Sequence, residues 1–212
     1  VSTSMLAEDL KPNRLEAAKD VAAEFINGRP NDNIGITLFA GETFTQCPLT
    51  VDHAVLLDMI HNIKCGLITD GTAVGMGIAN AVTRLKDSKA KSKVIILLTD
   101  GTNNKGDISP MTAAEIAKSF GIRVYTIGVG TNGMAPYPYP VGNTVQYVSM
   151  PVEIDEKTLT EIAGTTDGNY FRATSNSKLK EVYEEIDKLE KTKLNVKEYS
   201  KRDEEYHWFA LA

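Results

Sequence analysis

The chain has 212 residues, of which 42% are hydrophobic and 24% are charged, and this composition fits one α/β domain with a sizeable core. The net charge of −5, without any basic stripe, argues against nucleic acid as the main partner. No segment is long and apolar enough to cross a bilayer, and no signal peptide is visible.

Helical and strand patterns alternate along the first half of the chain. Asn13 can cap the first helix, Gly28 can end it, and Pro48 suits the end or edge of a strand. The elements expected here are a helix over 14–27, strands over 34–39 and 43–49, and helices over 52–63 and 72–85. Gly75 and Gly77 fall inside the last of these helices, which indicates close packing against a neighbour.

A continuous apolar run from Val94 to Leu98 forms the centre of the pattern. Such a run is typical of a strand that is buried on both faces of a parallel sheet. It ends abruptly in Thr99-Asp100-Gly101. Since open α/β sheets hold their ligands at the carboxyl ends of the strands, Asp100 is the first candidate for a functional residue.

The second half continues the alternation of helices and strands. We expect a helix from Ser109 or Pro110 to 120, a strand over 123–129, an irregular proline-rich stretch over 134–151, a helix over 155–163, a strand over 169–172 and a last helix from Ser175 or Asn176. The sequence therefore predicts an α/β fold: a doubly wound, mostly parallel sheet with one antiparallel edge strand and helices on both faces.

The two cysteines match no metal-binding spacing, so we interpret Cys47 and Cys65 as separate thiols. A disulfide between them is the alternative, because both flank the same predicted helix. Near the end of the chain, the aromatic cluster over 206–212 meets a run that is becoming apolar. Such a cluster is typical of a membrane–water interface, and the alternative is a disordered tail.

Three separated pieces of sequence lie where strands end or helices begin: Ser2 and Ser4, Thr72, and Asp100. In a doubly wound sheet these points share one edge. Their hydroxyl and carboxylate oxygens suit Mg²⁺, Mn²⁺ or Ca²⁺. Because few ligands are charged, a bound cation would keep excess positive charge and open positions, and it could take a carboxylate from a partner.

Each piece also has a simpler interpretation. The two serines fit a frayed terminus, Thr72 fits a helix cap, and Asp100 fits a cap of the following turn. Their joint occurrence, in this order, favours the metal site. Asp70 is either a turn residue, which we favour, or an acceptor that supports the site from behind.

The proline-rich stretch over 134–151 follows the carboxyl end of a predicted strand and should lie over the same edge as Asp100. This stretch either forms a rim beside the candidate site that determines which partner binds, with Tyr137 and Tyr139 as contact residues, or is a surface insertion that the fold tolerates.

At these residues the chain resembles a von Willebrand factor A (VWA) domain with a metal-ion-dependent adhesion site (MIDAS). The family pattern is Asp-x-Ser-x-Ser, then a distant Thr, then a distant Asp after a hydrophobic strand. Ser2, Ser4, Thr72 and Asp100 match its last four members. The stretches 4–5, 39–41, 46–50 and 66–68 are further similar to the Bat proteins, which are membrane-anchored and encoded in aerotolerance operons, and most of all to the BatA branch.

One departure concerns the beginning of the chain. The first Asp of the motif would stand directly before Val1, and the strand that leads into it occupies the middle of the family's sheet. We therefore expect residues upstream, and weaker metal binding without that Asp. Residues 1–190 are expected to form the VWA domain, and 191–212 an extension leading to a transmembrane helix.

The resemblance implies a protein–protein interaction module rather than an enzyme. Its cofactor would be Mg²⁺ (or Mn²⁺ or Ca²⁺), and its partners would be other Bat proteins or a MoxR-type AAA+ ATPase. Its expected location is the bacterial inner membrane, with the domain in the periplasm. The alternatives are a metal-dependent hydrolase or phosphotransferase that uses Asp100, and a scaffold with a vestigial metal site.

Overall fold

The computed structural model describes residues 1–66, 69–142 and 144–191. In chain order the elements are the 3-10 helix η1 (Thr3–Leu6), α1 (Arg14–Asn27), β1 (Ile34–Phe39), β2 (Thr43–Thr50), α2 (His53–His61), α3 (Val74–Leu85), β3 (Lys93–Thr99), α4 (Pro110–Ser119), β4 (Ile122–Val129), β5 (Met134–Val141), β6 (Thr144–Pro151), α5 (Glu156–Thr165) and β7 (Tyr170–Ala173). Residues 176–191 form a further helix, here called the C-terminal helix.

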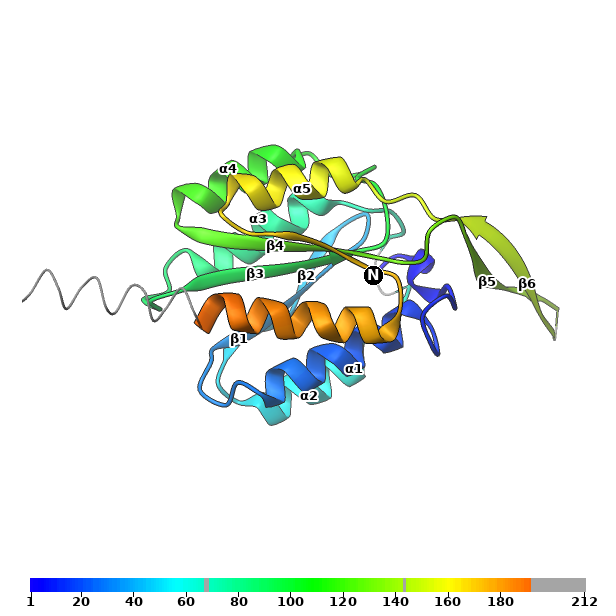
Figure 1. The fold of residues 1–212 in the computed structure, drawn as a ribbon, viewed down its shortest axis with the longest axis horizontal. Helices are drawn as coiled ribbons and strands as arrows, with labels where there is room; N and C mark the ends of the chain where they lie inside the picture. The colour runs from blue at the N-terminus through cyan, green and yellow to red at the C-terminus, as the bar shows by residue number, and fades with distance from the viewer. Residues whose placement is uncertain (67–68, 143, 192–212) are drawn as a thin grey trace, which may run out of the picture.

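The sheet is layered between two groups of helices. Strands β3, β4 and β7 pair in parallel in that order, and β1 and β2 form an antiparallel pair. Helices α3, α4 and α5 cover one face, and α1, α2 and the C-terminal helix cover the other (Figure 1). The predicted α/β class, mostly parallel with an antiparallel edge strand, is confirmed.

Strand β4 shows why the apolar runs predicted central strands. Successive side chains of a strand point to opposite faces. Accordingly Val124 packs among α3, α4 and α5, whereas Tyr125 and Ile127 pack against α1 and the C-terminal helix. A strand with helices on both faces has no solvent side, so its sequence shows no polar alternation.

The predicted close packing of α3 is confirmed at both glycines. A Cβ built on Gly75 would lie 2.0 Å from the carbonyl oxygen of Ile108, and one on Gly77 would lie 3.0 Å from the ring of Phe39. Any larger residue at Gly75 would push α3 away from the loop that precedes α4. Helix α3 nevertheless starts at Val74, two residues later than predicted.

The prediction of an irregular stretch over 134–151 is wrong. These residues form an antiparallel hairpin of β5 and β6, which projects from the body of the molecule (Figure 1). Prolines disfavour strands because they lack an N–H donor, but here they alternate at positions 136, 138 and 140. Every second residue of β5 therefore remains free to bond β6.

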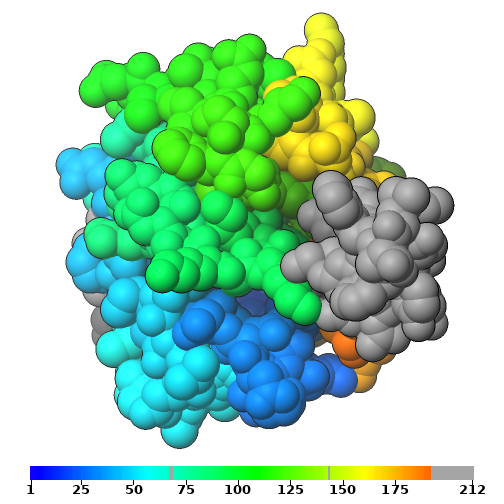
Figure 2. Space-filling model, turned by 90° about the vertical axis from the view of Figure 1, so that its left-hand side faces the viewer, coloured from blue at the N-terminus to red at the C-terminus, as the bar shows by residue number. Residues whose placement is uncertain are grey.

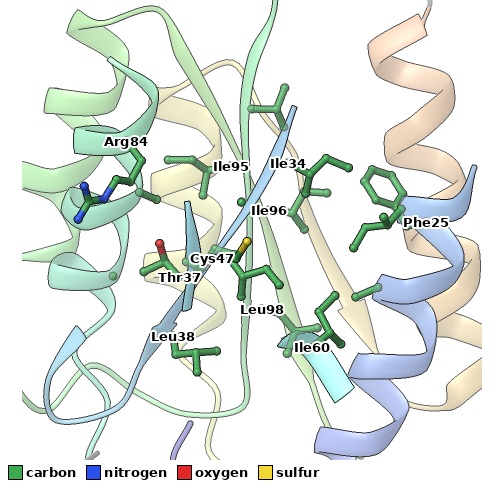
Figure 3. A pocket seen from close by; sticks show the side chains of 18 of the residues that line it. Phe25, Ile34, Thr37, Leu38, Cys47, Ile60, Arg84, Ile95, Ile96 and Leu98 are labelled. Carbon is green, nitrogen blue, oxygen red and sulfur yellow. The ribbon is translucent and has the colours of Figure 1, made fainter. Parts of the chain in front are cut away.

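A cavity of about 680 Å³ separates β1 from β3. It touches every residue of β1 and of β3 in succession, so it faces the edges of both strands rather than one side-chain face. Figure 3 shows Ile34 and Leu38 of β1 and Ile95 and Leu98 of β3 among the side chains that line this space. Figure 2 shows a hollow between the blue and green segments. This gap lies where the resemblance places a central strand.

Cys47 and Cys65 are both free thiols, as the first interpretation predicts. Among the described helices, none combines the length and apolar character that a membrane span needs. The extension predicted to lead to a membrane lies, from residue 192 onward, outside the described residues.

The C-terminal helix is held to the sheet through a buried acid. Glu190 accepts hydrogen bonds from the Tyr125 hydroxyl at 2.6 Å and the Ser92 hydroxyl at 2.9 Å, and it pairs with Arg123. Burial by itself would raise the pKa of Glu190, but these partners outweigh it and hold that pKa below its ordinary value of 4.5.

We expect Glu190→Gln to lower the free energy of unfolding at neutral pH by about 1–3 kcal/mol, because it removes the charge that Arg123 and the hydroxyls stabilise. A lowered pKa contributes stability above the unfolded value, and this contribution is lost as the pH falls through the folded value. Urea unfolding should therefore show a difference from wild type that shrinks as the pH falls below 4.5, the ordinary pKa of this group. Glu185→Gln, at an exposed position of the same helix, is the control; an equal loss in both variants would contradict the prediction.

Candidate functional site

Three loops meet at the carboxyl ends of β1 and β3. The Ala40 carbonyl, directly after β1, accepts a hydrogen bond from the Ala73 amide at 2.7 Å, and the Gly41 amide donates to the Thr69 carbonyl at 2.8 Å. The amino group of Val1 donates to the Phe39 carbonyl at 2.8 Å, which places the start of the chain at the same edge. The predicted site residues are therefore brought to one edge of the sheet.

The oxygens of three predicted ligands form a continuous cluster. Ser2 Oγ and Ser4 Oγ are 2.7 Å apart, and Ser4 Oγ donates to Asp100 Oδ1 at 2.9 Å. The serines come from the segment around η1 and Asp100 from the end of β3. Residues two and ninety-six positions apart thus share one hydrogen-bonded group.

Thr72 lies beside this cluster in a loop that two asparagines fix. The Thr72 amide donates to Asn104 Oδ1, and the Val74 amide donates to Asn103 Oδ1, both at 2.9 Å. The N-cap of α3 is Ala73, so the helix-cap interpretation of Thr72 is wrong. A Cβ built on Gly101 would lie 3.5 Å from Thr72 Oγ1, so this hydroxyl lies next to the residue that follows Asp100.

Asp70 holds the serine segment in place. Its carboxylate accepts hydrogen bonds from the Thr3 amide at 3.1 Å and the Thr3 hydroxyl at 2.8 Å. The bonds from Thr3 hold the pKa of Asp70 below its ordinary value. The favoured interpretation as a turn residue alone is therefore incomplete, because Asp70 fixes the residue between the two serines.

The two tyrosines of the predicted rim lie apart from the oxygen cluster. Tyr137 and Tyr139 are on β5, and Tyr139 is 57% exposed. The hairpin contacts the segment that follows the serines through Glu8, whose amide donates to the Pro136 carbonyl at 2.9 Å and whose carboxylate accepts from the Tyr147 hydroxyl at 2.9 Å. A role of these tyrosines in specificity stays a prediction.

The structure adds an arginine that the sequence did not reveal. Arg14, the first residue of α1, donates to Asp100 Oδ2 at 2.9 Å and binds both oxygens of Asp9 at 2.8 Å. The three side chains are only 3–4% exposed. Asp100 therefore accepts from the Ser4 hydroxyl with one oxygen and from a buried guanidinium with the other.

Burial governs the protonation of this group. It raises the pKa of Asp100 above its ordinary value, and Arg14 and Ser4 only partly offset the effect. For Asp9, burial also acts upward, but hydrogen bonds from Arg14 and the Thr131 amide outweigh it and lower the pKa. Asp9 is thus the firmer counter-ion of Arg14, whereas burial disfavours the charged form of Asp100.

Gly130 makes room for this arginine. Its φ of +140° is a conformation that favours glycine, and a Cβ there would lie 2.8 Å from Arg14 Nη2. The next residue, Thr131, donates its amide to Asp9 Oδ2 at 2.7 Å. The end of β4 and the start of the hairpin are therefore tied to the candidate site through Asp9 and Arg14.

The donor set fits a hard divalent cation. In an octahedral shell with bonds of about 2.1 Å, neighbouring oxygens lie about 3 Å apart. The 2.7 and 2.9 Å separations within the cluster match this spacing. In the described part of the chain no group of three or more His, Cys, Asp or Glu side chains could hold a metal, so a site here depends on hydroxyls and one acid.

Residues 1–185 match the family model described as the von Willebrand factor type A domain. The chain belongs to this family. The VWA domain also resembles solved structures of Bat-type proteins. An aerotolerance-related membrane protein from Bacteroides fragilis is 32% identical with a TM-score of 0.76, over 88% of this chain and 92% of that one. BatB from Bacteroides thetaiotaomicron is 35% identical with a TM-score of 0.78, over 90% and 95%.

The predicted resemblance to Bat proteins is confirmed, and the choice of the BatA branch stays a prediction. Among curated relatives, a UPF0353 protein of Nocardia farcinica is 32% identical over 88% of this chain. The VWA domain spans only 60% of that protein's length. The fold is also shared by a mussel byssus thread matrix protein, 24% identical with a TM-score of 0.65, whose structure has a zinc-occupied MIDAS motif.

Proposed function

We propose that this VWA domain is a metal-dependent protein–protein interaction module. Ser2, Ser4, Thr72 and Asp100 would hold Mg²⁺, or Mn²⁺ or Ca²⁺, and the ion would supply a positive centre that binds a Glu or Asp of the partner. The observation that carries the proposal is the oxygen cluster of Ser2, Ser4 and Asp100, whose spacing suits a shared cation.

The charges around the cluster favour an acidic ligand. Asp100 is the only carboxylate in the hydrogen-bonded cluster described above, and it already shares its charge with Arg14. A divalent ion there would be under-neutralised in a buried setting, where charge interactions are strong. A partner carboxylate offers the compensating charge and a hard oxygen ligand.

The chemistry of the cluster also favours binding over catalysis. Hydrolysis or phosphoryl transfer needs a nucleophile, a base and a group that stabilises the developing charge. The residues that contact one another here are hydroxyls, carboxylates and Arg14, whose guanidinium is already bonded to two acids. We therefore place the domain among non-enzymatic modules.

The cellular setting follows from the Bat resemblance. We propose a membrane-anchored Bat-type protein of the bacterial inner membrane, linked to aerotolerance or stress, with this domain in the periplasm. Segments outside the described residues would provide the anchor. The partners would be other Bat proteins or a MoxR-type AAA+ ATPase that offers an acidic side chain. The description of a structural neighbour as an aerotolerance-related membrane protein supports this setting.

Asp100→Asn is expected to weaken Mg²⁺ and Mn²⁺ binding more than about tenfold, since a ligand matters at least as much as the groups that support one. Asparagine keeps the size of the side chain, so Arg14 and Ser4 retain a partner and the fold should survive. Calorimetric titration, with Mn²⁺ electron paramagnetic resonance for weak binding, provides the measurement.

Asp107→Asn is the matched control, because Asp107 is exposed in the loop that follows the same strand. Equal metal binding by wild type and Asp100→Asn would remove the metal site from the proposal. For the partner, capture from native membranes should be lost with EDTA and with Asp100→Asn. Partner capture that is unchanged by EDTA and by Asp100→Asn would contradict the proposed metal-dependent interaction.

A further inference from the structure

The hairpin of β5 and β6 is an uncharged arm. Residues 134–152 contain no Asp, Glu, Lys or Arg, in a chain that has 51 of them. Every residue of β6 is exposed, and Val145, Tyr147 and Val148 are 48–60% exposed. Figure 1 shows the arm extending away from the layered body. Exposed apolar surface of this kind marks a site of interaction.

The prolines decide which edge of the arm can accept another strand. Pro136, Pro138 and Pro140 lie opposite Ser149, Tyr147 and Val145. In an antiparallel pair, residues alternate between bonding the partner strand and pointing their N–H and C=O outward. Because proline has no N–H, the prolines must occupy the outward positions.

Two hydrogen bonds confirm this alternation. The Pro136 carbonyl points away from β6, since it accepts from the Glu8 amide at 2.9 Å. Gly133 lies an odd number of residues before Pro136 and should therefore occupy an inward position. Its carbonyl accordingly accepts from the Val152 amide of the opposite side at 2.8 Å. The outer edge of β5 thus offers no N–H at its three prolines, and its base is covered by Glu8.

The outer edge of β6 has the opposite character. Val145, Tyr147 and Ser149 lie opposite the prolines, so their N–H and C=O groups point outward from the hairpin. The described residues supply no backbone partner for these amides. Such an edge is a template for strand addition. Pro151 has no N–H, so the series of outward N–H donors on β6 ends there.

We propose that β6 pairs antiparallel with β6 of a second copy of this chain, around a twofold axis. Only one self-pairing uses all three outward residues: Tyr147 opposite Tyr147 of the second copy, and Val145 opposite Ser149 of the second copy. This register exchanges six backbone hydrogen bonds, two at each of three residue pairs. It also places the two Tyr147 side chains beside each other across the strands, a favourable aromatic pair.

A second copy fits this edge for two reasons. The net charge of −5 makes two bodies repel each other, but the arm joins them through an uncharged surface at a distance from both. The four-stranded sheet β5-β6-β6-β5 also ends in a proline-bearing β5 on each side, so addition stops at two copies. One added strand buries less than the roughly 800 Å² per partner of a standard interface, so the dimer should be weak, with a Kd of about 1 μM or higher.

The test is sedimentation velocity of the full chain from about 10 μM to 1 mM, a range that brackets weak association. Wild type should show a monomer–dimer equilibrium. Tyr147→Pro removes an outward amide that β5 does not use, and it should weaken the dimer at least tenfold. Tyr147→Ala is the matched control, because it removes the same side chain and its 2.9 Å bond to Glu8 but keeps the amide. It should weaken the dimer less than Tyr147→Pro does.

Monomer at all concentrations, or equal dimerisation of Tyr147→Pro and wild type, would overturn the proposal. Growth to larger assemblies would overturn the closed sheet. A second measurement does not need the proline variant to fold: Tyr147→Cys should form a disulfide between copies under mild oxidation, and Tyr139→Cys on β5 should not. Equal cross-linking at both positions would also count against this pairing.

Discussion

Replacing Arg14 by methionine is expected to lower the free energy of unfolding by about 3–5 kcal/mol, which for a domain of this size corresponds to a Tm lower by roughly 6–20 °C. The variant leaves Asp100 and Asp9 buried without the guanidinium that bonds both of them. Removing one member of a buried charge group costs far more than removing an exposed pair. Chemical denaturation at neutral pH provides the measurement.

Measuring the Tm with added Mg²⁺ separates the structural effect of the Arg14→Met substitution from its effect on the candidate metal site. Arg14→Met frees Asp100 Oδ2 and removes a positive charge beside the oxygen cluster. Added Mg²⁺ should therefore raise the Tm of Arg14→Met more than that of wild type, because the ion replaces the lost charge. Lys178→Met, which removes an exposed pair with Glu181, is the control and should change stability by less than about 0.5 kcal/mol. A loss in Arg14→Met no larger than in this control would contradict the role assigned to Arg14.

The convergence of Ser2, Ser4, Thr72 and Asp100 at one edge was predictable because topology determines where strand ends lie. Asp100 follows a buried strand, and Thr72 precedes a helix, so both had to reach the carboxyl edge of a parallel sheet. The motif is then sufficient to predict that Ser2, Ser4 and Asp100 form one group, as the structure shows. The precise start of α3 was not predictable, because Asn103 and Asn104 reach it from a distant loop.

Arg14 and Asp9 were missed because amphipathic patterns identify the apolar face of a helix and say little about its ends. One signal was present. An arginine at the first position of a helix opposes the helix dipole, which favours negative charge there. Such a residue needs nearby acids, and Asp9 stands five positions before it. A charge that conflicts with its local position is a reason to look for a buried partner.

The hairpin was missed because its prolines were counted rather than placed. Three prolines in five residues indicate irregular structure, but a spacing of two keeps each of them on the same edge of one strand. The residues between them, Tyr137 and Tyr139, remain able to bond β6. The period of the prolines, and not their number, carried the structural information.

The space between β1 and β3 lies where the family resemblance places a central strand. Among the described strands, none pairs with the edge of β1 or of β3 that faces the cavity. The Val1 amino group already donates to the Phe39 carbonyl at the carboxyl end of β1, as a residue of a parallel neighbouring strand would. A chain that continued upstream from Val1 would therefore run into the cavity alongside both strands.

A six-residue extension before Val1, made of five β-branched residues and a final aspartate, is expected to raise the Tm by roughly 5–15 °C. Complete burial of five apolar side chains contributes up to about 3 kcal/mol each, and ordering the six residues costs about 1.5 kcal/mol each, which leaves a gain of up to about 6 kcal/mol. The added aspartate would stand at the first position of the MIDAS pattern, so Mg²⁺ affinity should rise at least about tenfold. Thermal unfolding and calorimetric titration measure the two effects.

Two control extensions distinguish the effect on thermal stability from the effect on Mg²⁺ affinity. The same apolar segment ending in alanine should raise the Tm but leave Mg²⁺ affinity near that of the original chain, because it fills the cavity without adding a carboxylate. A glycine–serine segment ending in aspartate should raise both the Tm and the Mg²⁺ affinity only slightly, because it buries little apolar surface and does not hold the aspartate in one position. If the apolar extensions left the Tm unchanged, the cavity would not be a strand site. The link between the completed sheet and the metal site would then lose its structural basis.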